Sequence, residues 1–189
     1  MKYTLIFDVD GTIIPLLVDF DSLREKIKRF LGVKEELKPL GLSLEKLQLD
    51  SALKARAWEL IEEEEIDSIE RLREEDYKGN VDLICDLHNS GFSIVLVTNR
   101  SHRSLELLLR KTGLNRCVDL TITREFSLDR RRQLESALKT VNGICLGFFG
   151  DTIYDETAAR ELGLRFRRVN SYKDLSVHVR EILNTYGNS

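Results

Sequence analysis

The chain has 189 residues, of which 42% are hydrophobic, so it can bury a full core in one sizeable α/β domain, or in a core domain with a small insertion. Its formal net charge is −3, whereas proteins that neutralise many phosphates are usually basic, which disfavours a nucleic-acid-binding scaffold. No apolar run is long enough to cross a bilayer as a helix, so we expect no membrane partner.

Five apolar segments, separated by helical patterns, predict the strands of a sheet. They cover residues 3–7, 92–97, 118–121, 144–149 and 164–169. The last segment alternates apolar residues with arginine and is expected at an edge of the sheet. Continuous apolar strands between helices are typical of a parallel sheet with helices on both faces, so we predict an α/β fold.

The stretch from about residue 13 to 79 interrupts this alternation and predicts a small helical insertion. Ser22-Leu23-Arg24-Glu25 is a capping-box pattern, which predicts a helix from there to about Leu31. Apolar residues recur at helical spacing through the rest of the insertion. We therefore expect an α/β core domain of residues 1–14 and 80–189, and a helical cap of residues 15–79.

The three cysteines give no metal-site pattern. Cys85, Cys117 and Cys145 are far apart, and each lies among apolar residues, so we expect buried, reduced thiols. The N-terminal residues lack the long apolar stretch of a signal peptide. Both features predict a cytoplasmic location.

Two aspartates come directly after the first predicted strand, in the sequence Asp8-Val9-Asp10-Gly11-Thr12. Ligands of open parallel sheets bind at the carboxyl ends of the strands, so both carboxylates can face one pocket. Gly11 permits a sharp turn and leaves its amide accessible to an anion. The alternative is an ordinary turn with two solvated aspartates.

Polar residues also follow the second and fourth predicted strands. Thr98 and Asn99 precede a helix, where a hydroxyl, an amide and free N–H groups make an anion site or a simple helix cap. Asp151 ends the fourth strand, and Asp155 lies near the start of the next helix, where an acidic residue is also favourable through the helix dipole. Clustered carboxylates repel each other unless a cation lies among them, and oxygen ligands suit Mg²⁺. The conjunction of the three strand ends therefore predicts a magnesium site beside an anion site.

In these residues the sequence resembles the haloacid dehalogenase superfamily of phosphatases. Residues 8–12 match the nucleophile motif of the family, Thr98 matches the second motif, and Asp151 with Asp155 matches the fourth. The resemblance implies a Rossmann-like sheet with the strand order 5-4-1-2-3. The helical insertion stands where a subgroup similar to the phosphoglycolate phosphatases carries its cap.

The resemblance also implies an activity, the removal of phosphate from a small phosphorylated metabolite. Asp8 would attack phosphorus and form an aspartyl phosphate, while Asp10 would protonate the leaving oxygen and then activate water. Dehalogenases of the superfamily lack the second aspartate of the first motif, so Asp10 indicates phosphoryl transfer. The phosphoryl oxygens would be bound by Thr98, Asn99 and the backbone amides near Val9 and Gly11. The Mg²⁺ ion would be bound by Asp8, the backbone carbonyl of Asp10 and Asp151, with Asp155 helping directly or through water.

The sequence departs from the family at the third motif, which is normally a lysine in the loop after the third strand or at the start of the next helix. Residues 123–132 contain no lysine but several arginines. An arginine can serve because it is always charged and grips phosphate with a planar fork. We predict that Arg130 fills this role, since it stands at a plausible helix start, with Arg124 and Arg131 as alternatives.

Two other functions are compatible with these residues. A phosphomutase would use the same Asp8 and Asp10 but return the phosphate to its substrate. A non-catalytic binding or regulatory protein is suggested by the missing lysine, although the intact carboxylates disfavour it. The expected partner is a small phosphorylated substrate, and the sequence leaves both its identity and the oligomeric state open.

Overall fold

The computed structural model describes residues 2–141 and 143–187. Residues 1, 142, 188 and 189, which belong to the predicted core domain, lie outside the described residues. The chain divides into two compact units, one formed by Met1–Pro15 with Arg73–Ser189 and the other by Leu16–Leu72.

The larger unit contains a five-stranded parallel sheet. Its strands lie side by side in the order β3-β2-β1-β4-β5, which is the predicted order read from the opposite edge. The predicted fold is thereby confirmed, and β5 is an edge strand as expected. The strands are β1 (Tyr3–Phe7), β2 (Ser93–Val97), β3 (Leu120–Ile122), β4 (Ile144–Gly150) and β5 (Phe166–Arg168).

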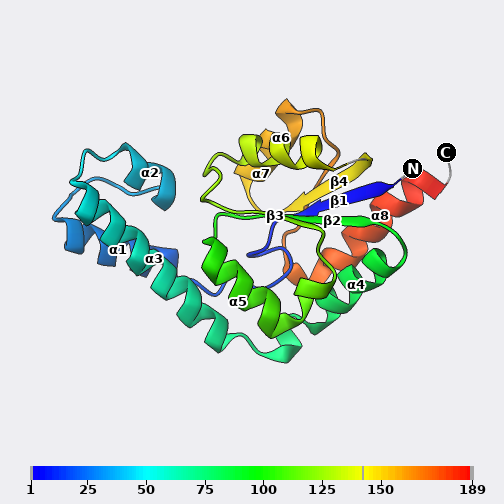
Figure 1. Cartoon of the computed structure of the whole chain (residues 1–189), viewed down its shortest axis with the longest axis horizontal. Coiled ribbons are helices and arrows are strands. Elements are labelled where there is room, and N and C mark those ends of the chain that lie inside the picture. The colour runs from blue at the N-terminus through cyan, green and yellow to red at the C-terminus, as the bar shows by residue number, and fades with distance from the viewer. Residues whose placement is uncertain (1, 142, 188–189) are drawn as a thin grey trace. The chain divides into compact units, whose positions relative to one another are not determined.

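Helices cover both faces of this sheet (Figure 1). On one face lie α6 (Arg130–Thr140) and α7 (Ile153–Glu161), and on the other lie α4 (Lys78–Asn89), α5 (His102–Thr112) and α8 (Leu175–Gly187). Beneath α6 and α7 the buried core includes Ile6, Val97, Leu134, Phe148 and Ala158. Three single 3₁₀ turns, at Glu74–Asp76, Leu114–Arg116 and Tyr172–Asp174, complete the connections. Both faces of the central strands are therefore buried beneath helices.

The smaller unit is helical, as the sequence predicts. It consists of α1 (Phe20–Leu31), α2 (Leu40–Lys46) and α3 (Ser51–Arg71), with buried Ile27 and Ile61 in its core. The predicted start of the first helix is wrong. Asp19, and not Ser22, caps α1, because its carboxylate accepts hydrogen bonds from the backbone N–H groups of Asp21 and Ser22.

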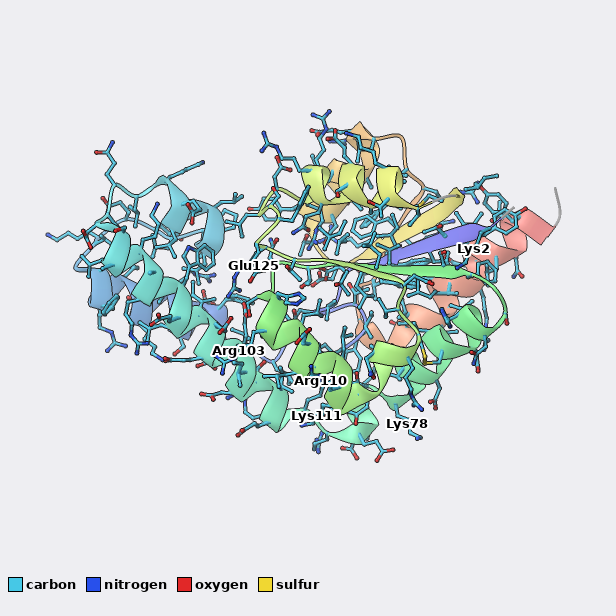
Figure 2. The ribbon with its side chains drawn as sticks, in the orientation of Figure 1. Lys2, Lys78, Arg103, Arg110, Lys111 and Glu125 are labelled. Atoms are coloured by element: carbon cyan, nitrogen blue, oxygen red, sulfur yellow. A yellow bond between two sulfur atoms is a disulfide. The ribbon has the colours of Figure 1, made fainter. Side chains whose placement is uncertain are left out.

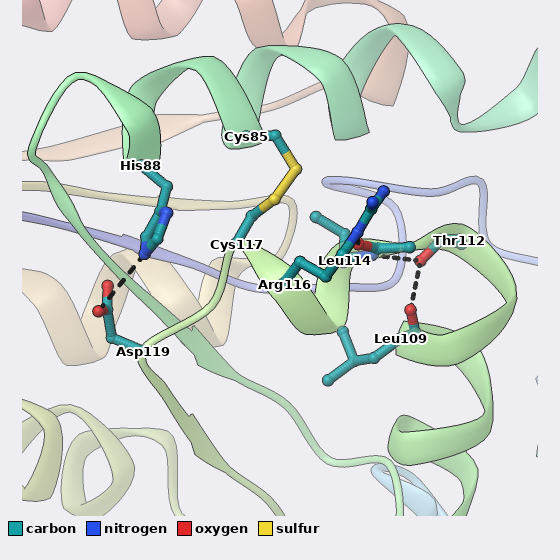
Figure 3. Close-up of a disulfide and its surroundings, with 9 residues drawn as sticks. Cys85, His88, Leu109, Thr112, Leu114, Arg116, Cys117 and Asp119 are labelled. Carbon is teal, nitrogen blue, oxygen red and sulfur yellow. Dashed lines mark hydrogen bonds and ion pairs between the residues drawn. A yellow bond between two sulfur atoms is a disulfide. The ribbon is translucent and has the colours of Figure 1, made fainter.

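The expectation of three reduced thiols is also wrong. Cys85 of α4 and Cys117 form a disulfide, with their Cα atoms 5.0 Å apart, and only Cys145 is free among the described cysteines. Figure 3 shows this disulfide beside the contact of His88 with Asp119. Folding brings together two cysteines that are 32 residues apart, which their sequence spacing did not indicate. Because disulfides are rare in a reducing cytoplasm, the cysteines no longer support the predicted location.

The disulfide should stabilise the larger unit without affecting the carboxyl edge of the sheet. It closes a loop spanning 32 residues. Chain entropy for such a loop gives about 3–4 kcal/mol of stability. We expect dithiothreitol to lower the free energy of unfolding in urea by about this amount. A Cys85→Ser/Cys117→Ser double variant is the control, since it should start from the lower stability and respond little to reductant. An oxidised protein whose unfolding ignored reductant would contradict the prediction.

None of the described helices is both long and apolar enough to cross a membrane.

Candidate active site

The loop after β1 forms the centre of the site. The backbone N–H of Asp8 donates to the carbonyl of Phe149 in the neighbouring β4, at 2.8 Å, so the nucleophile candidate is held at the end of the sheet. The chain then turns sharply, with the amides of Thr12 and Ile13 donating to the carbonyl of Val9. The amide of Gly11 donates to the carbonyl of Ile14, at 2.8 Å, so phosphate binding by this amide requires that contact to open.

Gly11 also makes room for a neighbouring carboxylate. Its φ is +78°, and a Cβ at this position would lie 2.3 Å from Oδ2 of Asp151. Any larger residue would therefore have to displace Asp151, and it would also be strained in the left-handed region. The loops after β1 and β4 thus approach each other closely only because position 11 is glycine.

The loop after β4 supplies the other two acidic groups. Asp151 is half-buried, and Asp155 is fully buried inside the N-terminal capping box of α7. Oδ2 of Asp155 accepts hydrogen bonds from the hydroxyl of Thr152, at 2.6 Å, and from its backbone N–H, at 3.0 Å. A Cβ on Gly150 would lie 2.7 Å from the carboxyl carbon of Asp155, so a second glycine keeps space for a carboxylate.

Three carboxylates meet at this point. Asp8, Asp151 and Asp155 each offer an oxygen within 4.8 Å of the others. Such a set of hard oxygen donors fits a divalent cation such as Mg²⁺. The structure therefore brings together three of the four aspartates that the sequence predicts at the metal.

Arg130, the first residue of α6, reaches the same cluster. Its Nη2 lies 2.6 Å from Oδ1 of Asp8, and its Nε lies 2.6 Å from Oδ1 of Asp155. The contact to Asp155 is close, but its geometry is not that of a directed hydrogen bond, so Coulomb attraction carries it. The arginine side chain is only 11% exposed, and it bridges two carboxylates, one directly after β1 and the other in the first turn of α7.

The other cations of this region lie elsewhere. Arg124 donates to the carbonyl of Asn99, at 3.2 Å, and Arg131 is an exposed residue paired with Glu135. The nearest lysines in sequence, Lys111 and Lys139, occupy the last turns of α5 and α6, and Figure 2 shows Lys111 at the far end of α5. Of the three arginines predicted as candidates for the third motif, Arg130 is the one in contact with the Asp8 carboxylate.

The predicted anion site follows β2. Thr98 is buried, and its hydroxyl accepts a hydrogen bond from the backbone N–H of Arg100, at 3.1 Å, while Asn99 is exposed. At the neighbouring loop, the labelled Glu125 accepts from the hydroxyl of Thr123, at 2.6 Å, and from the backbone N–H of His102, at 2.9 Å (Figure 2). The loops after β2 and β3 are therefore tied together beside the carboxylates.

Two polar residues complete the site, and neither was predicted from the sequence. The buried guanidinium of Arg100 holds both oxygens of Asp10, each at 2.8 Å. Gln133, fully buried in α6, accepts from Nη1 of Arg130, at 2.6 Å, and donates to Oδ1 of Asn99, at 3.1 Å. A signal was available for Arg100, because it directly follows the predicted anion residues, but Gln133 stands in an ordinary helical pattern.

The electrostatics of the cluster favour a bound cation. Burial raises the pKa of Asp8 well above its usual range, the charge of Arg130 opposes this shift, and Asp155 and Asp151 add to it. Burial, followed by the charge of Asp155, raises the pKa of Asp151 to about 6. Raised pKa values mean that the carboxylate charges are poorly compensated by the protein alone. A divalent cation would supply the missing compensation.

Comparisons with known proteins agree with this geometry. A family model described as haloacid dehalogenase-like hydrolase matches residues 4–163. No curated protein matches the chain.

Several solved structures have the same fold. A candidate phosphoglycolate phosphatase from Lactobacillus plantarum is 20% identical, with a TM-score of 0.65 over 88% of this chain and 86% of the other. CbbY from Rhodobacter sphaeroides, solved in complex with phosphate, is 18% identical, with a TM-score of 0.60 over 88% and 85%. A candidate β-phosphoglucomutase from Thermotoga maritima is 21% identical, with a TM-score of 0.53 over 88% and 84%. At these identities the structures are evidence for the fold alone.

Proposed function

The chain belongs to the haloacid dehalogenase-like hydrolase family, and from this premise we propose that it is a magnesium-dependent phosphatase of small phosphorylated metabolites. The observation that carries the proposal is the position of the Asp8 carboxylate, which lies against Arg130 and shares one cluster with Asp151 and Asp155. A carboxylate held between a fixed cation and a metal site is suited to attack a phosphate ester.

The reaction proceeds in two halves. In the first, an oxygen of Asp8 forms a bond to phosphorus, the bond to the leaving oxygen breaks, and Asp10 gives that oxygen a proton. In the second, Asp10 takes a proton from water as the water oxygen attacks phosphorus, and the bond between phosphorus and the Asp8 oxygen breaks. This releases phosphate and restores the Asp8 carboxylate. The phosphoryl oxygens are held by Thr98, Asn99 and the amide of Val9, and by the amide of Gly11 once its contact with the carbonyl of Ile14 opens. Arg130 offsets the negative charge.

The metal would be held by Asp8, the backbone carbonyl of Asp10, and Asp151. When bound, Mg²⁺ offsets the charge that the phosphoryl group and the nucleophile share. Both oxygens of Asp155 are engaged, one with Thr152 and one beside Arg130, so Asp155 would support the metal through water or through the arginine.

The cytoplasmic location stays a prediction.

Removal of the metal should abolish the activity. Because the carboxylate cluster has no histidine or cysteine ligand, we expect EDTA to reduce phosphate release from p-nitrophenyl phosphate to background and Mg²⁺ to restore it. Asp151→Ala should raise the Mg²⁺ concentration needed for half-maximal activity more than Asp155→Ala does. Full activity after rigorous metal removal would contradict the metal requirement, and equal effects of the two variants would contradict the ranking.

A screen of phosphorylated metabolites for released phosphate identifies the substrate class. The same screen, followed by analysis of the organic products, separates a phosphatase from a phosphomutase, which would rearrange a hexose phosphate without releasing phosphate. Absence of both outcomes with every ester would favour the binding or regulatory protein.

A further inference from the structure

Arg100 is a buried cation that the proposed reaction does not yet use. The residue is 3% exposed and lies in the loop after β2, two positions after Thr98. Its Nε donates to Oδ2 of Asp10 and its Nη2 donates to Oδ1, each at 2.8 Å. Because the guanidinium is a rigid planar fork, these two contacts fix the plane of the carboxylate as well as its position.

The backbone of Arg100 is itself anchored. Its N–H donates to the hydroxyl of Thr98, at 3.1 Å, and its carbonyl accepts from the N–H of Arg124, at 3.3 Å. The next residue, Ser101, caps α5 through a hydrogen bond from the N–H of Ser104. The guanidinium is therefore held by the loop after β2, while the carboxylate that it grips comes from the loop after β1.

We infer that Arg100 is a positioning residue, which fixes the carboxylate of Asp10 where it exchanges protons with the leaving oxygen and then with water. The inference rests on the proposed function, which gives Asp10 those two steps. When one oxygen of Asp10 turns its proton to the substrate, the other still accepts from Arg100 and keeps its orientation. The burial of Arg100 makes it act through Asp10 and not on the substrate.

The ion pair of Arg100 with Asp10 is not explained by a contribution to the stability of the fold. Burying an arginine and a carboxylate costs much of what their attraction returns, so such a pair adds little net stability. Proton transfer, in contrast, requires the acid to lie within hydrogen-bond reach of the leaving oxygen, and correct placement commonly contributes about 100-fold or more in rate. The bidentate contact of Arg100 fixes the orientation of the Asp10 carboxylate, which such placement requires.

The test compares two esters with different needs for a proton donor. An alkyl phosphate, glycerol 2-phosphate, needs protonation of its leaving oxygen, whereas p-nitrophenyl phosphate releases a stable phenolate. For Arg100→Gln we expect kcat/KM to fall about 100-fold with the alkyl ester and less than about 10-fold with the aryl ester. Arg100→Lys should recover part of the loss, and the inhibition constant of inorganic phosphate should stay unchanged in both variants.

Two control variants make the comparison specific. Asp10→Asn removes the acid itself, and it therefore shows how much more kcat/KM falls with the alkyl ester than with the aryl ester when the acid is absent. Arg100→Gln should show a similar difference between the two esters. Arg103→Gln, an exposed arginine in the first turn of α5 (Figure 2), should leave both esters unaffected. Thermal melts identify any variant that does not fold, and Arg100→Lys carries the comparison if Arg100→Gln fails.

Equal losses with the two esters, or no loss with either, would overturn the inference. These results differ from a failure of the proposed function, in which the unaltered protein releases no phosphate from either ester in the presence of Mg²⁺.

Discussion

Asp8→Asn should abolish turnover and leave the fold intact. An amide oxygen is not an anionic nucleophile, so no aspartyl phosphate forms, and we expect a loss on the order of 10⁴-fold or more. Because burial raises the pKa of Asp8, replacing the carboxylate by a neutral amide also removes a desolvation cost. The melting temperature should therefore change little even though the ion pair with Arg130 is lost.

The measurement is steady-state phosphate release by the purified variant, with thermal melts alongside. Asp82→Asn, which changes an exposed carboxylate of α4 in the same way, is the matched control and should keep full activity. Near-normal turnover by Asp8→Asn would show that the nucleophile lies elsewhere.

Arg130→Ala should lower turnover by about 100-fold or more, because removal of one preorganised charge-stabilising donor commonly costs this much. The arginine is the group that offsets Asp8 at 2.6 Å, and it also lies 2.6 Å from Asp155. Arg130→Lys should keep part of the activity, since an ammonium retains the charge but cannot span both carboxylates with a planar fork.

Removing Arg130 also leaves buried carboxylates without their partner, which typically destabilises a protein by about 3–5 kcal/mol. Kinetics must therefore be measured well below the melting temperature of each variant. Arg131→Ala and Arg132→Ala, which remove exposed arginines of the same helix turn, are the controls. If Arg124→Ala alone were damaging, the third-motif role would belong to Arg124, and if none of the four mattered, the binding-protein alternative would gain support.

The fold and the acidic part of the site are predictable from the sequence for a simple reason. Central strands buried on both faces must be apolar throughout, and the chain changes character abruptly where each strand ends. Asp8, Thr98 and Asp151 stand at those changes, and parallel strands bring their carboxyl ends to one edge. Local sequence and topology are then sufficient to predict that these groups meet.

The remaining features depend on contacts between segments that are distant in sequence. Arg100 follows the predicted anion residues directly, but its partner Asp10 is 90 positions away in the sequence. Gln133 joins Arg130 to a loop 34 positions away. No local pattern identifies either partner. The pairing of Cys85 with Cys117 likewise depends on how α4 packs against the segment before β3. The sequence does not decide where α1 starts, because Asp19 and Ser22 are both good N-cap residues. Only the backbone geometry distinguishes them, and it makes Asp19 the cap.

The site requires glycine at positions 11 and 150, although neither residue has a side chain that takes part in the chemistry. Each glycine leaves empty the volume that a neighbouring carboxylate occupies, Asp151 in one case and Asp155 in the other. A methyl group at either position would compete with a carboxylate for the same space, and the acidic cluster would spread apart. The shape of the site therefore depends on the absence of a side chain at these two positions. An effort to redesign the selectivity of the site has to keep both glycines unchanged.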